Sequence, residues 1–167
     1  MRLPGLLLSL TLFPGLALVS PAVGFAASAP PVPAPAPARP ADPINGVWKQ
    51  IDDKTHAVGA LIRFEDQDGT VSGKIIKIYP APGDPPNPVC TGCKGEEKNT
   101  PLVGFTLIRG MIPQGDGSYK DGTITDPDSG DDYHAQMKLS PDGQSLTLRG
   151  YLLVPLFGRS QIWQRAS

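Results

Sequence analysis

The sequence holds only two cysteines and two histidines among 167 residues, so the side chains that usually build metal centres are scarce. A tetrahedral zinc site needs four such ligands, and one Cys-x-x-C pair supplies two of them. Charge of either sign is also in short supply: 15 Lys and Arg stand against 16 Asp and Glu, and the basic residues are scattered. Because nucleic-acid binding requires a concentrated basic surface, we expect no nucleic-acid partner.

Long apolar runs are missing as well. The Leu-rich stretch 6–19 is shorter than the roughly 20 residues that a membrane-spanning helix needs. Arg2 precedes it and Ala27-Ser28-Ala29 follows it, which predicts a secretory signal peptide over residues 1–29, with an uncleaved membrane anchor as the alternative. The first cysteine is Cys90, so a lipoprotein attachment site is excluded and we expect a periplasmic or secreted protein.

Proline dominates the next segment. Residues 30–43 carry it at nearly every second position, which favours an extended polyproline conformation and predicts a disordered spacer. Residues 44–167 are enough for one domain with its own core, without metals or many cross-links.

From residue 44 onward, short stretches of alternating apolar and polar residues predict strands, and no amphipathic helix is recognisable. Glycine and aspartate fill the segments between them, as at 66–69, 114–117, 128–131 and 141–143, which is typical of hairpin turns. Eight strands are expected, at residues 46–51, 60–65, 70–79, 105–112, 119–125, 133–139, 145–151 and 160–165. The pattern predicts an all-β antiparallel meander of about eight strands closed into a barrel, with a two-sheet sandwich as the alternative.

Several motifs occur together across this domain: Gly46-Val47-Trp48, Cys90-Thr91-Gly92-Cys93-Lys94-Gly95, Pro101-Leu102-Val103-Gly104, Asp126-Pro127 with Gly130 and Tyr133, Arg149-Gly150-Tyr151, and residues 158–165. In this combination the chain resembles the bacterial exported family catalogued as domain of unknown function 2147. The resemblance implies an envelope protein of no established activity, and it supplies no catalytic residue or cofactor.

The start and end of the domain are also similar to lipocalin-like barrels. Those barrels open with Gly-x-Trp, here Gly46 and Trp48, and place an arginine of the last strand over the tryptophan. Arg165 and Arg159 are both candidates for this arginine, which would gain a cation–π attraction.

Cys90 and Cys93 have the spacing of redox motifs, but they lie in a Pro- and Gly-rich segment rather than between a strand and a helix. A structural disulfide in an oxidising compartment is our first interpretation. Dithiol redox chemistry and a metal site completed by His134, His56 or the nearby Glu96 and Glu97 are the alternatives.

Catalytic patterns are not found. No nucleophile elbow stands near His134, and the acidic segment 126–132 departs from a calcium-binding loop because Gly130 falls fifth rather than sixth. We therefore expect a protein that is not an enzyme and needs no cofactor.

Two hypotheses of function follow. The first is a binding barrel for a small apolar or lipid-like ligand, with the apolar segment 152–158 at its mouth, because Pro155 opposes a regular strand there. Candidate lining residues are Trp48, Phe105, Met111, Tyr133, Met137, Leu148, Phe157 and Trp163. The second is an envelope interaction or stress-accessory module that contacts an envelope protein through the Cys loop, residues 83–101.

Overall fold

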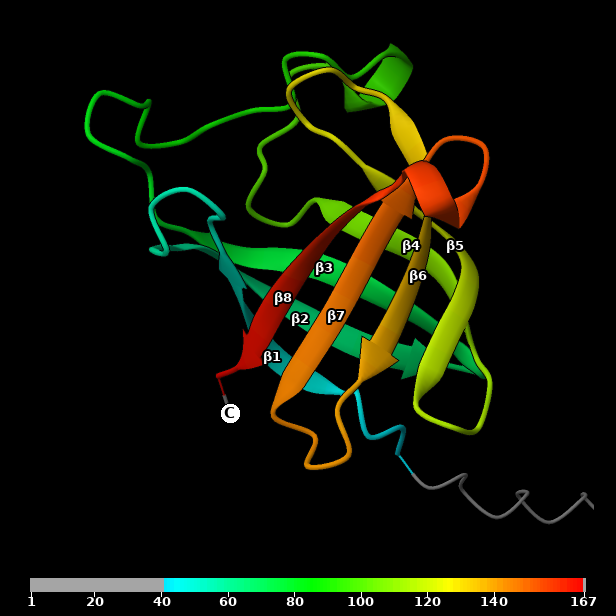
Figure 1. Ribbon diagram of the computed structural model, residues 1–167. Coiled ribbons are helices and arrows are strands. Elements are labelled where there is room, and N and C mark those ends of the chain that lie inside the picture. The colour runs from blue at the N-terminus through cyan, green and yellow to red at the C-terminus, as the bar shows by residue number, and fades with distance from the viewer. Residues whose placement is uncertain (1–40, 167) are drawn as a thin grey trace, which may run out of the picture. The chain divides into compact units, whose positions relative to one another are not determined.

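The computed structural model describes residues 41–166, so the predicted signal peptide and the predicted spacer up to residue 40 lie outside the described residues. Eight antiparallel strands close into a barrel in the order β1 to β8, with β1 hydrogen-bonded to β8 (Figure 1). The elements are β1 Gly46–Ile51, β2 Val58–Gln67, β3 Thr70–Ile78, η1 Gly95–Glu97, β4 Thr106–Pro113, β5 Ser118–Thr125, β6 Asp132–Leu139, β7 Ser145–Tyr151, η2 Pro155–Phe157 and β8 Arg159–Arg165. Among the described residues, no helix has the length and apolar character needed to cross a membrane.

The all-β barrel prediction is confirmed, and the sandwich alternative is wrong because β1 pairs with β8 and closes the sheet. The largest difference in strand bounds is at β2, which extends beyond the predicted 60–65 in both directions. The polar C-terminal residues of β2 remain paired with β3, because Asp68 and Gly69 both take positive φ and form a tight turn that pairs Gln67 with Thr70.

The meander gives the barrel two unlike ends. The connections β2–β3, β4–β5 and β6–β7 are short and lie at one end, together with the start of β1 and the end of β8. The four longer connections, at residues 52–57, 79–105, 126–131 and 152–158, lie at the other, which we call the loop end (Figure 1).

Trp48 seals the end that carries the short connections, which we call the short-turn end. Its side chain is fully buried, and its indole Nε1–H donates to the carbonyl of Ile44 at 2.9 Å. The guanidinium of Arg165 lies 4.3 Å from the ring centroid and donates to three backbone carbonyls around it. Beside them the buried Tyr119 hydroxyl donates to Asp42. Burial is the main cause that raises the Tyr119 pKa far above its ordinary value, and the carboxylate of Asp42 adds to it.

Candidate binding site at the loop end of the barrel

Inward-facing residues become accessible toward the loop end. Strand register places Ile124 opposite Tyr133 and sets Gly150 beside both, and all three are half-buried. Inward-facing positions nearer the other end of the same strands, such as Met137 and Leu148, are buried. Other half-buried residues near the loop end are Gln50, Ala60, Ile78 and Gln161. Along β5, β6 and β7 the interior is therefore packed more tightly away from the loop end, whereas under the 79–105 connection Cys90, Leu102 and Phe105 are buried.

The β7–β8 connection carries an exposed apolar segment, residues 152–157, which we call the apolar loop. The exposed fractions of Leu153, Leu156 and Phe157 are 88%, 78% and 83%. As the proline predicts, the segment leaves the sheet and forms a short 3₁₀ turn, η2. Arg149 on β7 donates to the carbonyls of Pro155 and Leu156, which fixes the shape of the loop.

Polar side chains connect the β1–β2 connection to β8 beyond the point where β1 and β8 cease to pair. These two strands pair only at Trp48 with Arg165 and at Lys49 with Gln164. Beyond that point Asp53 of the β1–β2 connection accepts hydrogen bonds from Arg159 at 2.8 Å and from Gln161 at 3.2 Å. Of the two arginines considered for Trp48, the structure thus places Arg165 over the ring and Arg159 at the loop end.

Asp52 shapes this same β1–β2 connection. Its carboxylate accepts hydrogen bonds from the backbone and hydroxyl of Thr55 and from the backbone of Lys54. These bonds, led by the backbone bond of Thr55, lower the pKa of Asp52. The ionised carboxylate therefore stabilises the turn that presents Asp53 to β8.

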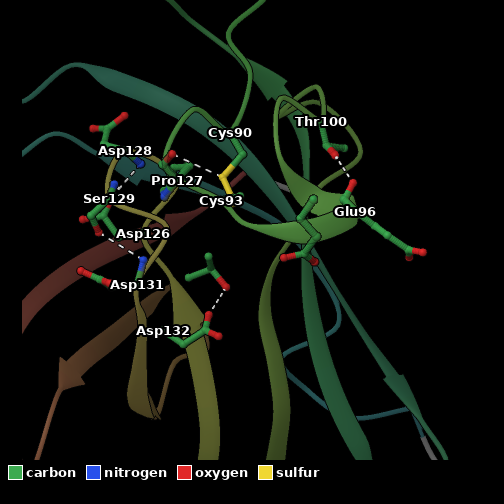
Figure 2. Close-up of a disulfide and its surroundings, with 12 residues drawn as sticks. Cys90, Cys93, Glu96, Thr100, Asp126, Pro127, Asp128, Ser129, Asp131 and Asp132 are labelled. Atoms are coloured by element: carbon green, nitrogen blue, oxygen red, sulfur yellow. Dashed lines mark hydrogen bonds between the residues drawn. A yellow bond between two sulfur atoms is a disulfide. The ribbon is translucent and has the colours of Figure 1, made fainter.

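The cysteine pair is buried rather than presented to solvent. Cys90 and Cys93 lie at disulfide distance, with their Cα atoms 5.4 Å apart. Figure 2 shows the pair against the β5–β6 connection, where Cys90 Sγ lies 3.3 Å from the carbonyl oxygen of Pro127. Gly92 packs so closely on Gly130 that a Cβ at either position would collide with backbone. The segment that holds the pair therefore packs the 79–105 connection against the β5–β6 connection at the loop end.

Arg109 on β4 links η1 to β5 at the loop end. Its guanidinium donates to Glu97 of η1 at 2.6 Å and to the Thr125 hydroxyl at 2.7 Å, and that hydroxyl donates in turn to Asp132. The guanidinium also lies over the ring of Phe105 at 5.2 Å. Sequence reasoning missed this network, and its only signal was an arginine within the mostly apolar 105–112 stretch.

The predicted lining residues fall into three groups. Six are buried in the core: Trp48, Phe105, Met111, Met137, Leu148 and Trp163. Tyr133 is half-buried at the loop end, and Phe157 is exposed on the apolar loop. One hollow of about 350 Å³ lies between the β1–β2 connection and β8, with Asp53, His56 and Gln161 in its lining, and another of about 290 Å³ lies over β5–β7. Which of the predicted residues contact a ligand stays a prediction.

The metal alternative gains no support. Cys90 and Cys93 face one another, whereas His134 lies on β6 beside the ring of Tyr151, with centroids 5.6 Å apart. No group of three or more His, Cys, Asp or Glu side chains in the described part of the chain is placed to hold a metal ion. The acidic segment 126–132 forms a turn in which Asp126 accepts backbone hydrogen bonds.

This architecture defines a lipocalin-like barrel, closed by eight antiparallel strands and sealed at one end by a tryptophan under an arginine. The chain belongs to the family described as uncharacterized protein conserved in bacteria (DUF2147), whose profile matches residues 46–165. Protein HP1028 from the human pathogen Helicobacter pylori, a member of the lipocalin family, has a similar structure, with a TM-score of 0.63 and 17% sequence identity. The similarity covers 74% of this chain and 83% of that one, and it shows the fold. No curated protein matches the chain in sequence.

Proposed function

We propose that this chain is an exported barrel that binds a small apolar or lipid-like ligand at its loop end, without catalysing a reaction on it. The observation that carries the proposal is the contrast between the two ends. One end is sealed by buried aromatic side chains, and the other combines half-buried inward-facing residues with an exposed apolar loop. Apolar surface gathered at one end of a folded barrel is typical of a binding region.

The chemistry of the loop end suits an amphiphile. Ile124 and Tyr133 offer apolar surface, and burying it would stabilise a complex by about 25 cal/mol for each Å² removed from water. Gly150 leaves space next to them, since a Cβ there would sit at ordinary contact distances of 3.5 and 3.8 Å. Arg159 and Gln161 supply polar groups near the same end for the head of the ligand.

Export is part of the proposal. Residues 1–29 would be the signal peptide, 30–43 a spacer whose last residues, Asp42 and Pro43, hydrogen-bond to Tyr119 and Arg165 of the barrel, and 44–167 the folded domain, placed in the periplasm or secreted. A cysteine pair at disulfide distance supports an oxidising compartment. Because both sulfur-bearing residues are buried, the pair supports a structural role better than a partner-binding one. We therefore prefer ligand binding to the interaction module.

The test is uptake of a fluorescent fatty-acid probe by the full chain in the absence of vesicles. Gly150→Leu places a branched side chain beside Ile124 and Tyr133 and should weaken uptake about tenfold or more, as expected for blocking one apolar contact region. Gly150→Ala is the matched control and should bind like the parent. The urea midpoint of each variant shows that it is folded. No uptake by the parent, or equal uptake by the folded leucine variant, would refute the proposal.

A further inference from the structure

We propose that the apolar loop inserts into the surface of a zwitterionic lipid bilayer and docks the loop end of the barrel against it. This interaction goes beyond the proposed function, because it requires no ligand inside the barrel. Its basis is the exposure of Leu152, Leu153, Val154, Leu156 and Phe157 within six residues. Neighbouring apolar side chains at such exposure are rare on a soluble surface unless they bind something.

The loop presents these side chains in a fixed shape. Arg149 donates to the carbonyls of Pro155 and Leu156, and η2 adds a hydrogen bond from Gly158 to Pro155. Gly158 lies so close to β7 that a Cβ on it would come within 2.5 Å of the carbonyl oxygen of Gly150. Little backbone entropy remains to be lost on insertion, so burial of the side chains is offset only by their own loss of rotamer freedom.

Shape and charge favour a bilayer over other occupants. The loop is a protrusion at the end of the barrel (Figure 1), so a protein partner or a second copy would need a matching groove, whereas a fluid bilayer needs none. The hollows beside β8 and over β5–β7 carry charged side chains such as Asp53 and Lys138, which an apolar protrusion seated there would have to desolvate.

The lipid class follows from the charges nearby. No charged residue occurs from 150 to 158, so the loop can enter the apolar boundary of a membrane without burying a charge. The neighbouring β5–β6 connection at the same end carries Asp126, Asp128 and Asp131. Arg149 and Arg159 flank the loop on β7 and β8, so charges of both signs surround it, and a zwitterionic surface without net charge repels neither sign.

The experiment reports on the loop itself, so that binding through any other part of the chain does not interfere. Phe157→Trp places an indole on the loop, while the native Trp48 and Trp163 are buried. With phosphatidylcholine vesicles, the emission of this variant should shift to the blue and be quenched by brominated lipid. Ile162→Trp is the matched control, because Ile162 is exposed on β8 outside the loop, and it should not be quenched.

Adding Leu153→Asp to the reporter variant should weaken the partitioning of the loop about tenfold or more, since it removes one buried leucine side chain and places a charge in the membrane boundary. Because charges of both signs surround the loop, replacing part of the phosphatidylcholine by an anionic lipid should change the partitioning less than Leu153→Asp does. A reporter that stays water-exposed in the presence of vesicles would overturn the inference. So would a blue shift that depends on protein concentration without vesicles, which would indicate a second copy. Fatty-acid uptake without vesicles tests the proposed function separately.

Discussion

Replacing Trp48 by alanine should destabilise the domain strongly, because this side chain seals the short-turn end. It is fully buried, its Nε1–H is bonded to the Ile44 carbonyl, and the Arg165 guanidinium lies 4.3 Å from its ring. Truncation of a buried aromatic residue costs about 3–5 kcal/mol. This range already includes the loss of the cation–π attraction and of the indole hydrogen bond, because the neighbouring residues partly fill the space that the truncated side chain leaves.

Urea unfolding followed by far-ultraviolet circular dichroism measures this loss. With a slope of about 2 kcal/mol per molar urea, Trp48→Ala should lower the midpoint by about 2 M. Arg165→Ala should produce a smaller loss, because it removes the guanidinium and leaves the indole packed. Ile162→Ala is the control on the exposed face and should change stability by less than about 0.5 kcal/mol. An unchanged midpoint for Trp48→Ala would show that the tryptophan is peripheral to stability, and the reasoning about the seal would be refuted.

Three further predictions concern other parts of the barrel. Thiol counting on unreduced, denatured protein should find Cys90 and Cys93 oxidised, and two free thiols in metal-free material would contradict the disulfide. Arg109→Met should cost about 1–2 kcal/mol in urea unfolding by releasing η1 from β5, and a loss no larger than that of an exposed control would count against the network. The folded state raises the pKa of Tyr119, so the stability that its neutral hydroxyl contributes is complete below about pH 10 and is lost as the pH rises beyond that value. Urea midpoints measured across pH should therefore fall less steeply at alkaline pH for Tyr119→Phe than for the parent. Identical pH profiles for the two proteins would contradict this prediction.

The strands and their order could be predicted because each signal is local. Alternation marks each strand, and turn residues such as Gly69, Gly130 and Gly143 take the positive φ that their turns require. In β5 the alternation is broken by Asp121, whose positive φ accompanies a register shift between Tyr119 and Gly122. Such a bulge turns the following residues to the other face, which a strict period of two does not predict.

The loop end could not be assembled from the sequence, because its contacts join distant residues. Arg159 and Asp53 are 106 positions apart, so nothing local distinguished Arg159 from Arg165 as the partner of Trp48. The close packing of Gly92 on Gly130 likewise depends on tertiary structure, since each glycine alone reads as part of a turn. The apolar loop was recognisable as an interruption of the strand pattern, but its exposure required the structure.

Because one end of the barrel is sealed and the other carries the loops, the residues that stabilise the fold differ from those proposed to bind. Large buried side chains such as Trp48 and Tyr119 stabilise the short-turn end, so substitutions there act on folding. Phe157 and Leu153 bury little surface in the barrel, and replacing them removes little packing. A polar substitution in the apolar loop should therefore reduce binding and change the free energy of unfolding by less than about 0.5 kcal/mol. If Phe157→Asp unfolded the domain instead, the loop would belong to the core, and both the ligand site and the membrane contact would lose their common physical basis.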